Sequence, residues 1–319
     1  MISPPYPDPV VSVALPAQQD VPASSGARVY LAYHKESPRI ASATLQPIHV
    51  GRVAAETPLA GMPGDATGEN ISHLNPEYCE LTAHFWAWKN NRDASTIGLM
   101  HYRRLLDLSP VPQDTRHPER FVMDFDAANY MAEADRSLAS DSLGAVVAPR
   151  PIRMRRSVET QYAHCHDAGD LALLRDLIAE MRPDFRPDFE RSLGGNRLII
   201  GNIFIMRRDI FDHYSALLFP LLAAVHRRRQ PEGRSAYQRR YIGFLAERIF
   251  SAYVMGDLMR EQFSGPEVTH RTILNIGRSD VTAANPLRLA RMVAKGQIGL
   301  RDLTGTLRNR YKNAGSGAL

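Results

Sequence analysis

The sequence predicts an α/β protein in which helices cover a sheet on both faces. Short apolar segments with strand character alternate along the chain with longer segments of helical periodicity. The 319 residues are 44% hydrophobic and 23% charged, a composition typical of a globular protein that buries a sizeable core. No apolar stretch reaches the ~18 residues that a membrane-spanning helix needs.

The first half of the domain begins with a predicted strand at 28–33, followed by a long loop over 51–72. This loop is rich in Gly, Pro, Asp, Asn and Ser, and loops of such length are uncommon unless they are functional. Asn75 as N-cap and Pro76 at the first helical position predict a helix that ends near 90–91.

The remaining elements follow in alternation. A strand at 96–101 leads directly into Tyr102. Further strands are predicted at 143–148 and 197–206, and further helices at 124–138, 157–181 (broken near Gly169), 208–228 and 236–256. This order favours an α/β sheet with helices on both faces.

Composition divides the chain into three predicted parts. Residues 1–26 contain six prolines and no basic residue, so we expect a disordered leader rather than a signal peptide. Residues 27–264 form the predicted domain. Residues 265–319 form a basic, partly helical C-terminal extension, with helical patches near 286–295 and 300–312. This tail could lie on anionic lipid or remain a solvated helix.

The chain is basic, with a net charge of +5 and a pI of about 9.3. Nearly all of the positive charge is arginine, whose planar fork suits phosphate, although a GC-rich genome explains the same usage. The two cysteines, Cys79 and Cys165, exclude a disulfide framework and a Cys-x-x-Cys metal site. This cysteine content fits a reducing cytoplasm.

Several signatures of known chemistry are absent from the sequence. It has no P-loop, no G-x-G-x-x-G after the first strand, no H-E-x-x-H and no G-x-S-x-G. The segment 162–167 contains His164 and His166. On a helix these two point to different sides, so we expect an ordinary solvated helix there rather than a metal site.

The segment 98–104 places His101, Tyr102, Arg103 and Arg104 at the end of a predicted buried strand. In open α/β sheets, ligands bind beyond the carboxyl ends of strands. Two arginines there can pair with a diphosphate. Surface arginines that close a strand explain the pattern equally well.

Two other segments carry candidate residues. Asp65, Asn70 and Ser72 lie in the long loop and could approach a sugar or phosphate, although ordinary turn chemistry explains them as well. Glu247 and Arg248 are adjacent on a predicted helix, so we expect their side chains to face different directions. Solvated helix charges are the ordinary explanation for this pair.

These segments together resemble a bacterial family found in capsular and exopolysaccharide synthesis clusters, long labelled a domain of unknown function and regarded as glycosyltransferase-like. The matching segments agree in order and spacing over roughly 28–256. They are His34-Lys35, Gly51, DATGENIS at 65–72, NPEYCELT at 75–82, WAWKN at 86–90, GLMHYRR at 98–104, NIFIM at 202–206, the region 214–220 and IGFLAER at 242–248.

The resemblance implies a GT-A-like fold, in which one nucleotide-binding sheet carries acceptor-binding elements near its C-terminal half. Ordinary GT-A enzymes hold a divalent metal with Asp-x-Asp. Here the corresponding strand ends in His101-Tyr102-Arg103-Arg104, so we expect arginines to replace the metal. His101 or Asp107 as a metal ligand is left open.

The expected reaction transfers a sugar from a nucleotide-sugar, with a UDP-sugar favoured, to a saccharide acceptor that could be lipid-linked. We expect the growing negative charge of the leaving group to be stabilised by arginines, and Glu247 to act as the base, with Asp65 as the competing candidate. The predicted catalytic residues are Glu247, Asp65, Arg103 and Arg104. The predicted donor-binding residues are His34, Lys35, Asn70, Ser72, His101, Tyr102 and Arg248.

We expect a cytoplasmic protein that contacts the inner face of the membrane at most peripherally and binds no nucleic acid. The sequence does not indicate an oligomeric state. A non-catalytic assembly or regulatory protein of a polysaccharide cluster is the main alternative. The sequence lacks the interleaving of basic and aromatic residues expected of a nucleic-acid-binding protein. It also lacks a persuasive carboxylate pair of the kind a glycoside hydrolase needs.

Overall fold

The computed structural model describes residues 26–110, 117–122, 124–140, 143–229 and 232–277. Nearly all of the predicted leader and most of the predicted tail, including its two helical patches, lie outside the described residues. The strands are β1 Ala27–Tyr33, β2 Leu45–His49, β3 Thr96–His101, β4 Arg104–Leu106, β5 Glu119–Val122, β6 Val146–Pro149, β7 Ile152–Arg153, β8 Arg197–Leu198, β9 Phe204–Arg207, β10 Val268–Arg271 and β11 Ile273–Ile276. The helices are α1 Asn75–Tyr78, α2 Leu81–Asn90, α3 Ala127–Ala139, α4 Val158–Cys165, α5 Ala168–Met181, α6 Arg186–Gly194, α7 Arg208–Arg228, α8 Tyr241–Met255 and α9 Leu258–Gln262.

A sheet of nine strands forms the centre of the described chain and mixes parallel with antiparallel pairs. β2, β1 and β3 are parallel neighbours, and β9 lies between β3 and β6, antiparallel to both. β3 and β6 therefore run in the same direction, and β10 is parallel to β6. The carboxyl ends of β1, β3, β6 and β10 thus reach one edge of the sheet, which we call the strand-end edge.

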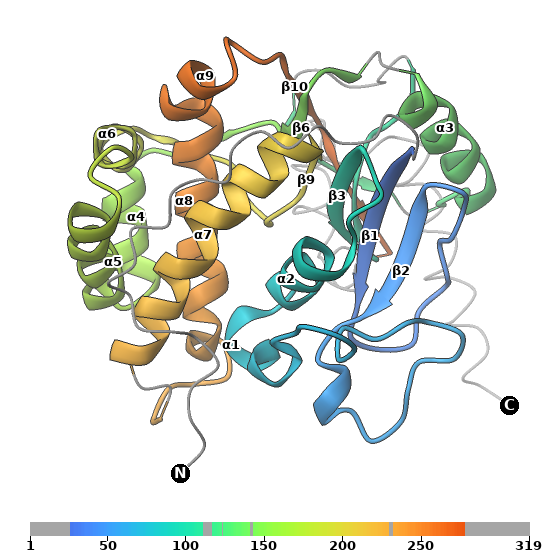
Figure 1. Ribbon diagram of the computed structural model, residues 1–319, viewed down its shortest axis with the longest axis horizontal. Coiled ribbons are helices and arrows are strands. Elements are labelled where there is room, and N and C mark those ends of the chain that lie inside the picture. Colours follow the sequence, from blue (N-terminus) through green and yellow to red (C-terminus); the bar gives the residue numbers. More distant parts are fainter. Residues whose placement is uncertain (1–25, 111–116, 123, 141–142, 230–231, 278–319) are drawn as a thin grey trace, which may run out of the picture.

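Successive side chains of a strand point to opposite faces of a sheet, and the core follows this rule. In β1, Tyr30 and Ala32 belong to one apolar cluster, whereas Val29, Leu31 and Tyr33 belong to the other. Figure 1 shows α4 to α8 gathered on one side of the sheet and α3 on the opposite side. The predicted fold class, a sheet with helices on both faces, is confirmed.

The helix predicted over 75–91 is two helices. Asn75 is the first residue of α1 rather than its N-cap. α1 ends at Tyr78, and its C-cap Cys79 has a φ of 52°, which is unusual for a residue other than glycine. The Asn75 side chain donates a hydrogen bond to the Cys79 carbonyl at 2.7 Å. α2 then starts at Leu81, so the break places Glu80 at a corner between the two helices.

The run predicted as one strand over 197–206 is also interrupted. β8 and β9 are separated by a turn in which Gly201 has a φ of 92° and Asn202 a φ of 47°. β3 and α7, in contrast, have the bounds expected from the sequence, and the predicted break near Gly169 lies between α4 and α5.

The sheet continues beyond the domain boundary predicted at residue 264. β10 pairs with β6, and β11 pairs with β4 and β5. Only Thr272 separates β10 from β11. This segment therefore joins two parts of the sheet, so the domain extends at least to Ile276.

Candidate functional site

The ends of β1 and β3 lie side by side because the two strands are parallel neighbours, with Ala32 opposite His101. His34 follows β1 and Tyr102 follows β3, and the centroids of their rings are 5.5 Å apart. The Arg103 guanidinium lies 5.1 Å from the centroid of the Tyr102 ring. The structure thus brings the predicted residues after these two strands into one group at the strand-end edge.

This group is strongly cationic. Arg103 and Arg104 are half-buried, and the ion pairs found among the described residues include neither of them. Burial lowers the pKa of His34, and the nearby positive charges of Lys35, His101, Arg103 and Arg240 lower it further. A concentration of positive charge of this kind favours an anionic ligand.

Glu80 forms a buried network that holds the end of β3. Its Oε1 accepts a hydrogen bond from Asn202 Nδ2 at 2.8 Å and lies 3.6 Å from His101 Nε2. His101 Nε2 also lies 3.1 Å from the Gly201 carbonyl oxygen. Since both neighbours of Nε2 are acceptors, this nitrogen carries a proton and donates it.

The environment of Glu80 keeps its carboxylate ionised. Burial alone would raise its pKa, but His101 and Asn202 together lower the pKa to about 2. Asn202 Nδ2 also donates to the Gly243 carbonyl at 3.1 Å. One carboxylate therefore ties the start of α2, the end of β3 and the turn before β9 together.

Glu247 lies on the other side of the same turn. Its Oε1 accepts a hydrogen bond from the Gly201 backbone at 2.7 Å, and its Oε2 pairs with Arg248 at 3.0 Å. Arg248 also donates to Gln161 at 2.8 Å. Burial raises the pKa of Glu247, and the charges of Arg248 and Arg104 oppose this rise. The expectation that Glu247 and Arg248 face different directions is wrong, because their long side chains converge.

The candidate residues of the long loop bind to the loop itself. Asp65 is completely buried, and its carboxylate accepts hydrogen bonds from the backbone of Gly51 at 2.9 Å and of Arg52 at 3.0 Å. The Ser72 hydroxyl donates to Asp65 at 2.5 Å. The Asn70 side chain donates to carbonyls within the loop. In the structure these side chains fix the shape of the loop.

α2 anchors the outer part of this loop. Lys89 pairs with Glu69 at 3.3 Å, and the Trp86 indole donates to the Thr67 carbonyl at 3.0 Å. Lys89 is therefore a structural partner of the loop. Glu80 is not, since its contacts are to His101 and Asn202.

Sequence reasoning gave no role to three residues that line this group: Cys79, Asn202 and Arg240. Arg240 Nε donates to Cys79 Sγ at 3.3 Å, and burial raises the pKa of the Cys79 thiol to about 12. Asn202 Oδ1 is buried without a partner among the described residues. The Gly201-Asn202 dipeptide, a turn signal inside an apolar run, was the available clue.

The open question of metal ligands concerns His101 and Asp107. In the part of the chain that the structure describes, no three His, Cys, Asp or Glu side chains converge as a ligand set. Asp107 is buried and accepts a hydrogen bond from the Ser109 hydroxyl at 2.5 Å. His166, of the other suspected pair, stacks on Phe244 with 4.1 Å between ring centroids, so it is packed rather than fully solvated.

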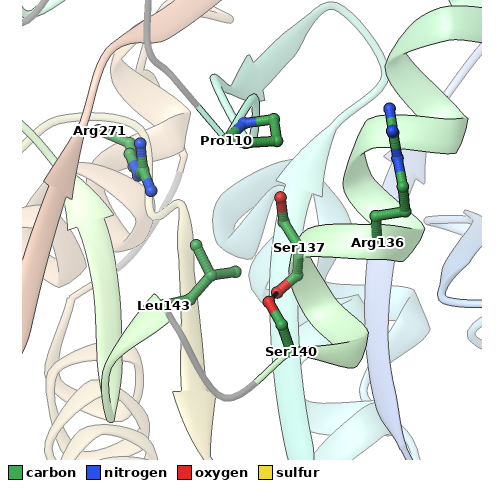
Figure 2. Close-up of a pocket in the computed structure, with 6 residues that line it drawn as sticks. All are labelled: Pro110, Arg136, Ser137, Ser140, Leu143 and Arg271. Atoms are coloured by element: carbon green, nitrogen blue, oxygen red, sulfur yellow. Dashed lines mark hydrogen bonds between the residues drawn. The ribbon is translucent and has the colours of Figure 1, made fainter.

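Two hollows are lined by residues other than the arginines of this group. Figure 2 shows the first, where Arg271 from β10 faces Ser137 of α3 and Ser140, the residue after α3, across the hollow. The second is lined by Met154, Arg155, Arg156, Gln161 and His164. It adjoins the group, because Gln161 accepts a hydrogen bond from Arg248.

The fold and the residues after β1 and β3 define an α/β protein with a group of basic side chains at one edge of its sheet. The chain matches the family model described as "Domain of unknown function (DUF4422)" over residues 28–258. It belongs to this family, so the family resemblance seen in the sequence is confirmed to that extent. A search of curated proteins gives no match.

Among solved structures, the chain is similar to the apo structure of WbbM, which is described as a bifunctional glycosyltransferase. The TM-score is 0.70 and the sequence identity 26%, and the match covers 80% of this chain and 46% of that chain. The chain thus spans less than half the length of the WbbM chain. The α/β fold is that of a glycosyltransferase structure, whereas the link to capsule synthesis stays a prediction.

Proposed function

We propose that this protein is a glycosyltransferase that moves a sugar from a nucleotide-sugar, with a UDP-sugar favoured, to a saccharide acceptor in surface polysaccharide synthesis. The observation that carries the proposal is the joint presence of the glycosyltransferase-like fold and of Arg103 and Arg104 at the strand-end edge, without carboxylate partners among the described residues. Donor binding at this edge follows the rule for open α/β sheets.

The leaving nucleoside diphosphate gains negative charge as the bond to the sugar breaks. Arg103 and Arg104, assisted by Lys35, are positioned to stabilise this charge by charge-assisted hydrogen bonds. His101 supports donor binding differently. Its Nε2 is held by Gly201 and Glu80, so the orientation of the His101 ring at the end of β3 is fixed.

Glu247 is the stronger of the two candidate bases. Its side chain is 17% exposed, and each carboxylate oxygen accepts one hydrogen bond, which leaves lone pairs for a substrate hydroxyl. Asp65 is fully buried and receives three donors. In an inverting transfer, Glu247 takes the proton of the acceptor hydroxyl. The oxygen of this hydroxyl attacks the anomeric carbon of the donor sugar, and the nucleoside diphosphate leaves.

Arg248 acts in this proposal through Glu247 rather than on the donor directly. It is 2% exposed and pairs with Glu247 and Gln161. Of the carboxylates nearest the predicted diphosphate, Glu80 is held by His101 and Asn202, and Glu247 is assigned to the acceptor hydroxyl. The side chains facing the diphosphate are cationic, so arginines are proposed in place of a metal. Activity that disappears with EDTA and returns with manganese would contradict this part.

A thermal-shift screen of nucleotide-sugars, followed by transfer assays with the best donor, tests the proposal. A ligand that binds only the folded state raises the melting temperature. We expect a UDP-sugar to do so, and R103A/R104A to lose most of the shift. R186A/R260A removes the same charge from exposed positions of α6 and α9 and should keep it. A donor that binds without any transfer would favour the non-catalytic alternative.

Membrane contact remains part of the proposal. No helix in the described ranges has both the length and the apolar character to cross a bilayer. The expected position at the inner face of the cytoplasmic membrane would be tested by fractionation of cells that express the full chain.

A further inference from the structure

Three aromatic rings gather beside the proposed base. His166, the C-cap of α4, stacks on Phe244 of α8, with 4.1 Å between the ring centroids and 29° between the ring planes. Tyr237 lies in the segment that leads into α8, and its ring centroid is 5.0 Å from that of Phe244 and 5.8 Å from that of His166. We call His166, Tyr237 and Phe244 the aromatic platform.

The outer ring of the aromatic platform is open to solvent. Tyr237 is 53% exposed, and among the described residues Val53 is the other large hydrophobic side chain that is exposed to this degree. Burial lowers the pKa of His166 to about 4, and the charge of Arg248 adds to this effect, so the His166 ring is uncharged at neutral pH. Single exposed apolar side chains are common on protein surfaces. Tyr237, in contrast, extends a stack of two uncharged rings into solvent.

Phe244 and Glu247 lie on the same face of α8. This helix is buried along most of its length, and the residues that stay partly exposed are Phe244, Glu247 and, at its C-terminal end, Met255. Side chains three positions apart on a helix are neighbours, with their Cβ atoms about 5–6 Å apart. A pyranose ring is of similar width, so a ring held against Phe244 has a hydroxyl within reach of Glu247.

Arg240 connects the aromatic platform with the donor group after β1 and β3. Its guanidinium lies 5.7 Å from the centroid of the Phe244 ring, and its Nε donates to the thiol of Cys79, the residue before Glu80. Burial lowers the pKa of His34, and the positive charge of Arg240 is among those that lower it further. The aromatic platform therefore adjoins both the proposed base and the predicted donor site.

A sugar ring matches this arrangement chemically. One face of a pyranose carries C–H groups, whereas its rim carries hydroxyls. The C–H face packs on the electron-rich face of an aromatic ring, and the hydroxyls need a few fixed polar partners. Glu247 has lone pairs left for one hydroxyl, and the exposed guanidinium of Arg240 is a donor for another.

We propose that the aromatic platform is the acceptor subsite, and that Tyr237 and Phe244 stack on the C–H face of the acceptor pyranose beside Glu247. This inference rests on the proposed function and adds to it a site for the acceptor. The acceptor class is a pyranose with several C–H groups on one face. The donor diphosphate stays with Arg103 and Arg104.

Saturation-transfer NMR on the full-length protein tests the subsite. The probes are the methyl glycosides of glucose, galactose, mannose and N-acetylglucosamine, each offered with UDP at saturation so that the donor site is filled. We expect at least one probe to receive saturation mainly at the ring protons of one face. Y237A should remove most of this signal, whereas Y237F keeps the ring and should retain it.

Two further variants sharpen this experiment. Y237L keeps an apolar side chain without the aromatic ring and should behave as Y237A does. V53A removes the other exposed apolar side chain and should bind as the unmodified protein does. A signal that survives in Y237A or Y237L would overturn the inference, and so would the absence of a signal for every probe.

The thermal shift caused by UDP separates the acceptor from the nucleobase of the donor, because bases also stack on aromatic rings. Y237A should keep the full UDP shift, whereas R103A/R104A should lose most of it. Because Tyr237 is exposed, Y237A without ligand should melt close to the unmodified protein. Loss of the UDP shift in Y237A would mean that the aromatic platform holds the nucleobase, which contradicts the inference.

Transfer kinetics with the glycoside that binds best provide the last readout. We expect Y237A and Y237L to raise the acceptor KM by about tenfold or more, the usual size of effect when a stacking ring is removed. Y237F should change it little. The kcat and the donor KM should stay nearly unchanged, because the aromatic platform binds the acceptor without taking part in the chemistry.

The two proposals fail in different ways. Transfer with an acceptor KM that does not depend on Tyr237 would refute the acceptor subsite and leave the proposed function standing. Saccharide binding that depends on Tyr237, combined with no transfer by the unmodified protein, would refute the proposed function and leave a saccharide-binding site.

Discussion

Glu80 Oε1 lies 3.6 Å from His101 Nε2, and this contact joins the start of α2 to the end of β3. The corner at Cys79, with its φ of 52°, makes the contact possible because it separates α2 from α1 just before Glu80. A carboxylate buried beside the strand end fixes the orientation of the His101 ring. It also holds the turn at Gly201 and Asn202, where the proposed base is anchored.

The Glu80 contact predicts a pH-dependent stability. The pKa of Glu80 is about 2 in the folded protein and 4.5 for an unperturbed side chain. A lowered pKa stabilises the folded state above about pH 4.5, and the stabilisation is lost as the pH falls towards 2. We expect E80Q to lose up to about 3 kcal/mol of unfolding free energy at neutral pH, and much less near pH 2.

Urea unfolding at a series of pH values measures this difference. E69Q is a suitable control, because the Glu69 side chain is 65% exposed and its replacement should change the unfolding free energy little at any pH. A difference between E80Q and the unmodified protein that stays constant from neutral pH to pH 2 would contradict the electrostatic account of Glu80.

The sequence predicted the bounds of an element correctly where one hydrophobic pattern extends over its whole length. β3 and α7 have the predicted bounds because an apolar run and a long helical period define them. The corner at Cys79 could not be expected, since no glycine or proline marks it. Tertiary contacts stabilise it instead, among them the bond from Arg240 to Cys79 Sγ, across 161 residues of sequence. Strands of four residues such as β10 and β11 carry too little periodicity to be recognised.

The candidate site was predicted in part for the same reason. The residues after β3 follow from one local segment and a general rule about strand ends. The network of Glu80 and Asn202 joins residues that are 122 positions apart, and no local pattern contains such a pairing. Arg153 and Arg197 likewise become neighbours only through the register of β7 and β8.

Arg103 and Arg104 should differ from lysine at the same positions. If the guanidinium forks bind the diphosphate in bidentate fashion, R104A should lower kcat by about 10²- to 10³-fold, the usual effect of removing one donor to a developing anion. R104K keeps the charge but not the fork, so it should recover only part of the loss. Steady-state kinetics with the donor varied provide the test, and full recovery by lysine would mean that charge alone is needed.

Glu247 as the base predicts a particular pH profile. Its pKa is raised above the ordinary 4.5 by burial, and a base is active when deprotonated. Activity should therefore fall as the pH decreases through this raised pKa. E247Q should lower kcat by about 10²- to 10⁴-fold across the profile. If the residual activity of E247Q still falls with decreasing pH in the same way, the titrating group is a residue other than Glu247.

Asp65 should behave as a structural residue. The backbone N–H groups of Gly51 and Arg52 donate to the two carboxylate oxygens of Asp65. D65N replaces one of these oxygens with an NH₂ group, which cannot accept, so the loop loses one of its central hydrogen bonds. We expect a loss of about 1–3 kcal/mol in unfolding free energy. The kcat of the protein that remains folded should change by less than tenfold. A large fall in kcat with unchanged stability would restore Asp65 as the competing base.

Gly98 in the middle of β3 tests the packing that supports the whole site. A Cβ at this position would lie 2.8 Å from Ile205, 2.9 Å from Val29 and 3.0 Å from the Phe204 carbonyl oxygen, so neighbours on β1 and β9 would have to move. We expect G98A to lower the unfolding free energy by about 1–3 kcal/mol, the usual effect of overpacking. G194A is the matched control, because a Cβ there meets no atom within 4 Å. Thermal unfolding of the two variants side by side should show a lowered midpoint for G98A only. Equal midpoints would mean that β3 can separate from its neighbours without loss, and the strand-end residues would then lack the rigid support that donor binding requires.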